Sequence, residues 1–452
     1  MVCLESMLSG RGRKNLIGPN ENLKALLEVL ANSYHEKTNP DGIINLGIAE
    51  NTLMHQELCK YMNNSCRLES KHLSYGDTAW GSLRLRMNLA GFVNKYFHPV
   101  MEINPGEIIV SSGVSGILDQ LAWATCNEGD GVLIGKPVYS GFTFDLASRS
   151  KVHDVAVSFG DIDPFSAKAL QCYKEQLEAF NRKGEGKIKA VILTNPHNPF
   201  GKCYPVETIK ALMRFCQEHN LHLISDEIYA LSVFKTPYNA DAVGFHSVLS
   251  VDPTGLIDPN RIHTLYGMSK DFSANGLRLG LIITRNPTLI QAMYSVVPFS
   301  WASAPADLIW STILEDTKFL TYYLDENQRR LGEGYELLTT TLDRYGIKYV
   351  KGGNAGFFLW VDLSFALEKP EDGGEPGVME DKKLNKKIWD GKVYLATTGG
   401  FQGEKTGWYR ITFAHPKPLL MLGLKRSEGA ESCNKTSDGV EIFSVVKIGR
   451  VL

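Results

Sequence analysis

Residues 265–280 read Leu-Tyr-Gly-Met-Ser-Lys-Asp-Phe-Ser-Ala-Asn-Gly-Leu-Arg-Leu-Gly. Lys270 follows an apolar run typical of a β-strand, and Arg278 stands shortly before a second apolar run. A lysine that forms a Schiff base must be partly desolvated, and small neighbours leave room for a planar ring. An arginine just beyond it can bind a phosphate through its fork of N–H donors. Because a lone Ser-Lys pair more often marks a surface lysine, its interpretation depends on the rest of the chain.

The composition is that of an ordinary globular protein. The chain has 452 residues, of which 43% are hydrophobic and 22% charged, which favours two domains or one large domain with a smaller lobe. The formal net charge is −2 and no basic block stands out, so we expect neither nucleic acid nor a membrane as a partner. Single, scattered cysteines and a polar segment at residues 1–15 favour a cytoplasmic protein without metal sites or disulfides.

Several predicted strands end in polar or small residues that suit ligand binding. In open α/β sheets, ligands collect at the carboxyl ends of the strands. Glycine-rich starts of helices also expose backbone amides to a phosphate. Each motif alone has a plainer interpretation, such as a capped turn, a loop aromatic or a solvated strand end. The candidates found in this way are Ser112, Gly113, Val114, Tyr139, Asn198, Asp226 and Tyr229.

Taken together, these motifs and the 265–280 segment resemble the class I/II aminotransferase family, which has fold type I and uses pyridoxal 5′-phosphate (PLP). The resemblance covers roughly residues 47–425, with the motifs in the family's order. It implies an α/β fold whose large domain has a mostly parallel central sheet and whose smaller domain is α+β. We therefore expect an N-terminal arm with part of the small domain at 1–70, the large domain at 71–320, the C-terminal small domain at 321–426, and an unassigned tail at 427–452.

The resemblance also implies roles for the cofactor-binding residues. Lys270 would carry the Schiff base and later remove the α-proton, while Asp226 would pair with the pyridine nitrogen. Asn198 and Tyr229 would contact the phenolic oxygen. Tyr139 would stack on the ring. The phosphate would be held by Ser112, Gly113, Val114, Ser269, Arg278 and, from a neighbouring subunit, Tyr75.

Two departures from the family pattern affect the phosphate site. One extra residue separates Tyr75 from Gly81, so a core or turn tyrosine is the alternative interpretation of Tyr75. Gly267 stands where plant members usually have a serine that donates to the phosphate. Either Ser269 or backbone amides would then replace that serine.

The segment Ala49-Glu50-Asn51 is similar to a block near the N-terminus of 1-aminocyclopropane-1-carboxylate (ACC) synthases. This likeness implies that Glu50, the Ala49 backbone and Asn198 line the substrate pocket, and that Arg410 grips the substrate α-carboxylate. We therefore expect an ACC-synthase-like lyase that deprotonates Cα of S-adenosylmethionine or a related sulfur-containing amino acid. The alternatives are an aminotransferase using a 2-oxoacid, a C–S lyase of secondary metabolism, and a non-catalytic PLP-fold binding protein. By resemblance, the enzyme is a homodimer with shared active sites.

Overall fold

The structure is a computed structural model that describes residues 7–16, 21–370, 374 and 376–426, so the predicted tail at 427–452 lies outside the described residues. Its centre is a seven-stranded sheet with strand order β2-β8-β7-β6-β5-β3-β4. The strands are β2 (Ile108–Ser111), β3 (Gly131–Gly135), β4 (His153–Val157), β5 (Ile188–Thr194), β6 (His222–Asp226), β7 (Ile262–Gly267) and β8 (Gly280–Thr284).

Only β8 runs against the direction of the other strands in this sheet. Neighbouring strands from β4 to β7 pair in parallel, whereas β8 pairs antiparallel with both β7 and β2. The carboxyl ends of β2, β3, β5, β6 and β7 therefore share one edge. The predicted mostly parallel α/β sheet is confirmed.

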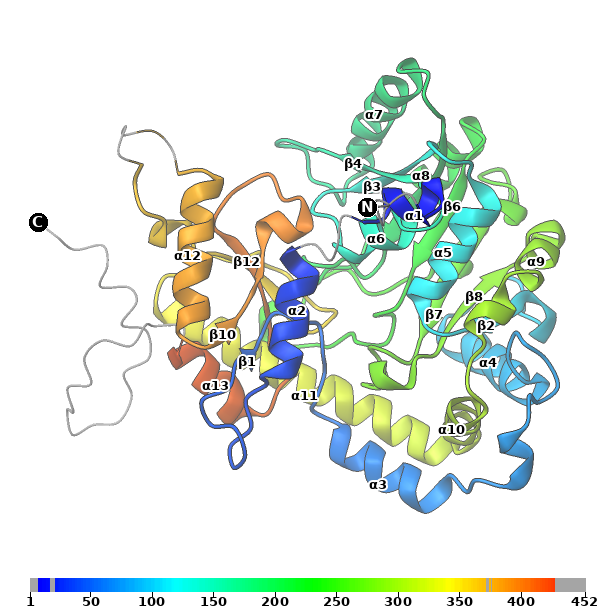
Figure 1. Ribbon diagram of the computed structural model, residues 1–452, viewed down its shortest axis with the longest axis horizontal. Helices are drawn as coiled ribbons and strands as arrows, with labels where there is room; N and C mark the ends of the chain where they lie inside the picture. The colour runs from blue at the N-terminus through cyan, green and yellow to red at the C-terminus, as the bar shows by residue number, and fades with distance from the viewer. Residues whose placement is uncertain (1–6, 17–20, 371–373, 375, 427–452) are drawn as a thin grey trace, which may run out of the picture.

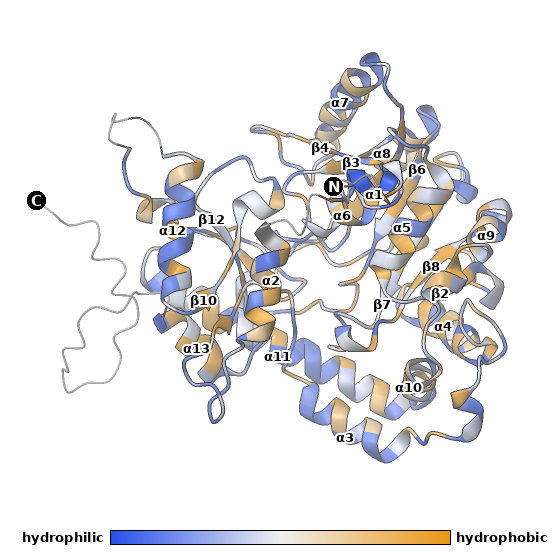
Figure 2. Ribbon diagram, viewed as in Figure 1, coloured by the Kyte–Doolittle hydropathy of each residue, from blue (hydrophilic) through white to orange (hydrophobic). Residues whose placement is uncertain are grey.

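Helices cover both faces of the sheet because its strands are apolar on both sides. Alternate strand residues point to opposite faces, so Ile108 and Val110 join one hydrophobic cluster while Ile109 joins another. In Figure 2 the strands β2 and β8 are coloured as hydrophobic. One face packs against α4 (Leu83–Tyr96), α7 (Leu170–Arg182), α8 (Val206–Glu218) and α10 (Ala304–Glu315), and the other against α5 (Val114–Thr125), α6 (Gly141–Ala147) and α9 (Pro287–Tyr294).

A second hydrophobic core lies around a three-stranded sheet of order β11-β12-β9. An additional parallel pair joins β1 near the N-terminus to β10, so this core contains residues from both ends of the described chain. The smaller α+β part expected from the resemblance is therefore present. Its elements are β1 (Ile44–Asn45), β9 (Phe358–Asp362), α12 (Val378–Asp390), β10 (Val393–Tyr394), β11 (Ala396–Thr397), β12 (Trp408–Thr412) and α13 (Lys417–Arg426).

The helix α11 (Thr317–Arg344) connects the two cores. Leu320 and Leu324 near its start pack in the cluster of the large sheet, whereas Leu331 and Leu338 pack in the second core. Figure 1 shows α11 running along the lower part of the view from α10 toward α13. The remaining α-helices are α1 (Gly10–Lys14), α2 (Glu21–Ala31) and α3 (His55–Ser65). Among the described helices, none has the length and apolar character needed to cross a membrane.

Candidate active site

The predicted site residues gather where the carboxyl ends of the parallel strands meet. Asp226 is the last residue of β6, and Lys270 follows the end of β7 by three residues. Asn198 and Tyr139 lie in the loops that follow β5 and β3. This placement agrees with the expectation that ligands bind at this edge of an open sheet.

Lys270 contacts the segment that comes from the second core. Its Nζ donates a hydrogen bond to the carbonyl oxygen of Ala49 at 2.6 Å. Burial lowers the pKa of Lys270 to about 8, and the nearby Arg410 lowers it further, while Glu50 and Asp226 raise it. A lysine with this pKa has a substantial neutral fraction near neutral pH, which is the nucleophilic form of the amine.

The two adjacent carboxylates at the end of β6 have different surroundings. Glu227 is fully buried and accepts hydrogen bonds from Ser225, Ser247 and the Val248 amide, so it belongs to the core. Asp226 accepts one backbone hydrogen bond, from the Ile228 amide at 3.2 Å. Burial raises the pKa of Asp226 to about 6, while the backbone hydrogen bond and the charge of Lys270 lower it. Of the pair, Asp226 is therefore the carboxylate electrostatically coupled to Lys270.

An arginine lies against the glycine at the start of α5. Gly113 has a φ of +85°, and a Cβ there would lie 2.5 Å from an Nη atom of Arg278. Gly113 is also the N-cap of α5, and no side chain caps the first turn of that helix. The first-turn amides and the guanidinium together form an anion site of the kind that binds phosphate.

The other residues predicted for this anion site have distinct surroundings. The Ser112 amide donates to the carbonyl oxygen of Ser300 at 2.9 Å and is therefore already used within the protein. Val114 and Ser269 are both partly buried. The available donors are consequently backbone amides after Gly113 and polar side chains rather than the Ser112 N–H.

Arg410 is buried in the strand β12 and makes two hydrogen bonds. Its Nη1 donates to Oδ1 of Asn198 at 2.9 Å, and its Nη2 donates to the carbonyl oxygen of Gly47 at 2.5 Å. The rings of Phe358 and Phe401 have their centroids 5.0 Å from the guanidinium carbon. Its Nε has no hydrogen-bond partner although it is buried. Because an unpaired buried N–H is unfavourable, this edge of the guanidinium is suited to an anionic ligand.

Glu50 lies beside this arrangement and is held by amide groups. Its Oε1 accepts from Nδ2 of Asn275 at 2.9 Å, and its Oε2 accepts from Nδ2 of Asn45 at 3.3 Å. The Glu50 carboxylate raises the pKa of Lys270, which places the two groups within electrostatic reach of each other.

Two predicted aromatic residues flank the same region. Tyr229 is buried, and its ring centroid lies 6.0 Å from Nζ of Lys270. Burial raises the pKa of Tyr229, while Arg410 lowers it. Burial likewise raises the pKa of Tyr139, whose charge neighbours include Arg410 and Asp226. Both tyrosines therefore lie in the electrostatic environment of the same charged groups.

Tyr75 is apart from the gathered residues. It is 84% exposed, and its ring centroid lies 5.4 Å from that of Trp301. This exposure rules out the alternative of a core tyrosine within a single chain. Nearby in the same exposed segment, Phe299 is 87% exposed.

Several residues of the site were not identified from the sequence. Asn45 and Asn275 hold Glu50, and Phe401 lies against Arg410. The buried Asp145 of α6 is another, with its pKa raised to about 7 by burial and lowered by a hydrogen bond from Ser115. The turn chemistry of Asn45 is a local signal that could have been found, whereas the contacts of Asn275 and Phe401 depend on the fold.

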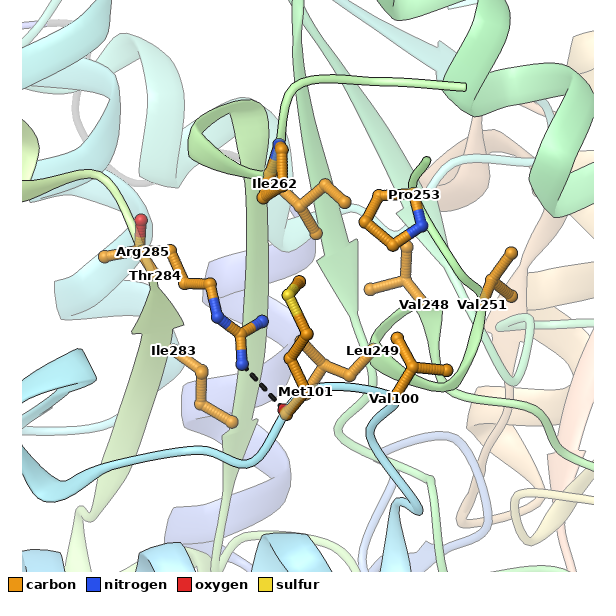
Figure 3. A pocket seen from close by; sticks show the side chains of 11 residues that line it. Val100, Met101, Val248, Leu249, Val251, Pro253, Ile262, Ile283, Thr284 and Arg285 are labelled. Atoms are coloured by element: carbon orange, nitrogen blue, oxygen red, sulfur yellow. Dashed lines mark hydrogen bonds between the residues drawn. The ribbon is translucent and has the colours of Figure 1, made fainter. Parts of the chain in front are cut away.

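A small pocket lies at the opposite edge of the large sheet. It includes Ile262 at the start of β7 and Thr284 at the end of β8, and its volume is about 10 Å³. Figure 3 shows Arg285 directed toward Met101, whose carbonyl oxygen accepts from Nη2 at 2.7 Å. This volume is roughly that of one water molecule, so the pocket cannot hold an amino acid. Within the described ranges, no cluster of three or more His, Cys, Asp or Glu residues could hold a metal ion.

Comparison with known proteins places this geometry in context. A sequence profile of the family described as aminotransferase class I and II matches residues 41–421. The chain is 33% identical over 395 residues to the probable aminotransferase gliI of Aspergillus fumigatus, covering 85% of this chain and 88% of that protein. It is 33% identical over 405 residues to the 1-aminocyclopropane-1-carboxylate synthase-like protein 1 of Mus musculus, covering 87% of this chain and 77% of that protein.

A solved structure has a similar fold. The aspartate aminotransferase from Thermus thermophilus with maleate superposes with a TM-score of 0.71 at 20% sequence identity. The superposition covers 93% of this chain and 98% of that one.

Proposed function

Because this chain belongs to the class I and II aminotransferases, which are PLP-dependent enzymes, we propose that it acts on an α-amino acid with a cationic sulfur centre. S-adenosylmethionine is the first candidate. In the proposed lyase reaction, Cα loses its proton, the Cγ–S bond breaks with sulfur keeping the electron pair, and Cα bonds to Cγ. The products are ACC and methylthioadenosine.

The residues at the sheet edge fit PLP. Arg278 lies where a Cβ on Gly113 would collide with it, and the first turn of α5 is uncapped, which together suit the phosphate. Asp226 is suited to the pyridine nitrogen, and Asn198 and Tyr229 to the phenolic oxygen. When bound, PLP supplies an aldehyde that reacts with an amine and a protonated ring that withdraws electrons from Cα.

The protein's own groups would then orient the substrate and move one proton. We assign the substrate α-carboxylate to the unpaired Nε edge of Arg410, because a carboxylate there would satisfy that buried donor. Lys270, with its pKa lowered to about 8, would take the proton from Cα through Nζ. Asp226 would keep its negative charge opposite the ring nitrogen.

The observation that carries the choice of substrate is the state of Glu50. Both of its carboxylate oxygens accept from neutral amides, at 2.9 Å and 3.3 Å, so no bonded cation neutralises the group. A negative carboxylate at this position favours a substrate whose side chain is positively charged. A sulfonium is such a charge and is also a good leaving group.

We also propose that the enzyme is a homodimer. Phe299 and Tyr75 are 87% and 84% exposed, which is unusual for large aromatic residues on a free surface. Association through this surface would bury them and would bring Tyr75 of one subunit toward the phosphate site of the other.

A second candidate is amino-group transfer to a 2-oxoacid. It is supported by the likeness to a protein named probable aminotransferase, which covers 85% of this chain. The two reactions would use the same residues up to the loss of the Cα proton. They differ in whether a proton returns to the cofactor or a side-chain bond breaks.

The test is mass analysis of the products formed when the purified holoenzyme is mixed with S-adenosylmethionine, with the Lys270→Ala variant as a control. Methylthioadenosine together with ACC is the expected result. Methylthioadenosine without ACC would mean that elimination occurs but ring closure does not. No turnover of S-adenosylmethionine would reject the proposed substrate, and incubation with amino acids and 2-oxoacids, then with thioether amino acids, would test transfer and C–S cleavage.

A further inference from the structure

The contacts of Glu50 differ from those of the other acidic residues on which charged partners act. Among the described residues, no lysine or arginine nitrogen forms an ion pair with Glu50, whereas surface carboxylates such as Glu326 and Glu315 each pair with an arginine. Two asparagine amides take the place of a cation at Glu50. Neutral donors can fix the direction of a carboxylate without cancelling its charge.

Asn45 supplies the donor on the side of the second core. Its Oδ1 accepts from the amides of Gly47 at 3.2 Å and Ile48 at 2.8 Å, which fixes its Nδ2 as the atom facing Glu50. The same turn offers the Gly47 carbonyl to Arg410 and the Ala49 carbonyl to Lys270. Asn45 thus shapes the backbone that both cationic residues contact, so its substitution would disturb more than Glu50.

Asn275 supplies the other donor, from the loop between Lys270 and Arg278. Its Nδ2 donates to Oε1 of Glu50 at 2.9 Å. Its carbonyl oxygen accepts from Nη1 of Arg278 at 2.9 Å and from the Arg278 amide at 3.3 Å. Arg278 has a φ of +55°, so the end of this loop is a tight left-handed turn. Asn275 therefore joins the arginine of the anion site to the carboxylate at the substrate pocket.

We propose that Asn275 is a positioning residue that holds Glu50 toward the substrate side chain and so sets the preference for a cationic over a neutral side chain. This inference rests on the proposed function, because it assigns Glu50 to the substrate pocket. It adds the group on which the charge preference depends. The Asn275 carbonyl keeps its contact with Arg278 when the side chain is shortened, so the effect on the substrate is separable from that on the cofactor.

The experiment measures binding rather than turnover. Dissociation constants of the holoenzyme are measured by calorimetry for two pairs of ligands that differ by one methyl group and one positive charge. The pairs are S-adenosylmethionine with S-adenosylhomocysteine and S-methylmethionine with methionine. The ratio within each pair reports the charge preference, and the PLP content of each variant is measured alongside.

The variants form a double-mutant cycle. Asn275→Ala is expected to lower the preference for the cationic ligand about 10-fold, the size expected when a hydrogen bond to a charged group is lost. Glu50→Gln is expected to lower it at least as much, and the double variant no further than Glu50→Gln alone, because Asn275 acts through Glu50. Asn275→Ser provides a second truncation if the alanine variant folds poorly.

A matched control is available on the surface of the molecule. Asn88 also donates from Nδ2 to a glutamate oxygen at 2.9 Å, but its partner is Glu315 on α10. Asn88→Ala should leave both ligand ratios unchanged.

Each other outcome has a definite meaning. An unchanged ratio in Asn275→Ala, additive effects in the double variant, or no charge preference in the wild-type enzyme would overturn the inference. Absence of binding by both pairs would overturn it together with the proposed substrate class. A charge preference that depends on Asn275 without release of methylthioadenosine would support the inference while rejecting the proposed reaction.

Discussion

The guanidinium of Arg410 donates through Nη1 to Oδ1 of Asn198 at 2.9 Å, in the interior of the protein. Arg410 lies in β12 of the three-stranded sheet, and Asn198 lies in the loop after β5 of the large sheet. The contact therefore joins the two sheets at the candidate active site. It also fixes the plane of the guanidinium, so that its unpaired Nε has a defined direction.

Replacing Arg410 by lysine should weaken substrate binding. An ammonium group cannot reproduce the planar fork that bonds Asn198 and the Gly47 carbonyl while presenting Nε to a ligand. We expect the KM for the amino-acid substrate to rise about 10- to 100-fold, with PLP content unchanged. Steady-state kinetics measures the effect, and Arg329→Lys on the exposed face of α11 serves as the control. Equal KM values for the two variants would contradict the assignment of Arg410.

Replacing Gly113 by alanine should weaken cofactor binding. The residue has a φ of +85°, and a Cβ would lie 2.5 Å from Arg278, so both the backbone and the arginine must shift. We expect the dissociation constant for PLP to rise about 10-fold or more. Fluorescence titration of the apoenzyme measures it. The control is Gly116→Ala, because a Cβ at Gly116 meets its nearest atoms only at 3.8 Å. If both alanine variants bind PLP equally, the anion site lies elsewhere.

The capture of PLP by the apoenzyme should depend on pH through Lys270. Only the neutral amine reacts with an aldehyde, and burial lowers the pKa of Lys270 from 10.5 to about 8. The rate constant of capture is therefore expected to rise with pH up to about 8 and to level off above it. In Glu50→Gln the inflection should move to lower pH, because the Glu50 carboxylate stabilises the ammonium form. Stopped-flow absorbance measures the rate, and an inflection near that of a free lysine would contradict the desolvated environment.

Introducing a charge at Phe299 should weaken the proposed dimer. The side chain is 87% exposed in the single chain, so Phe299→Asp leaves the packed core intact. We expect the dimer to dissociate at concentrations where the wild-type enzyme stays associated, as measured by sedimentation velocity. Met379→Asp on α12 is the control, since Met379 is also exposed, at 63%. A monomeric wild-type enzyme would reject the proposal.

Much of the architecture could be predicted because its signals are local. The apolar runs ending at Asp226 and before Lys270 indicated strands, and both are strands of the large sheet. The long helix predicted at 327–342 is the second half of α11, which begins at Thr317. Its earlier start was missed because that half packs against a different core, and the change of partner interrupts the apolar pattern.

The adjacent residues Asp226 and Glu227 show where local signals end. The sequence presents them as a pair, but only the fold assigns Glu227 to Ser247 and leaves Asp226 near Lys270. Successive residues of a strand point to opposite sides, so their roles depend on what packs on each side.

The sequence by itself determined the order of the motifs, the strand ends that carry them and the family to which they belong. These properties depend on neighbouring residues, whose apolar periodicity and turn chemistry are written in the chain. Only the tertiary structure decided that Asn275 bonds to Glu50, 225 positions away, and that Arg410 bonds to Asn198, 212 positions away. Such contacts have no local signature, because they exist only when the second core packs against the edge of the large sheet.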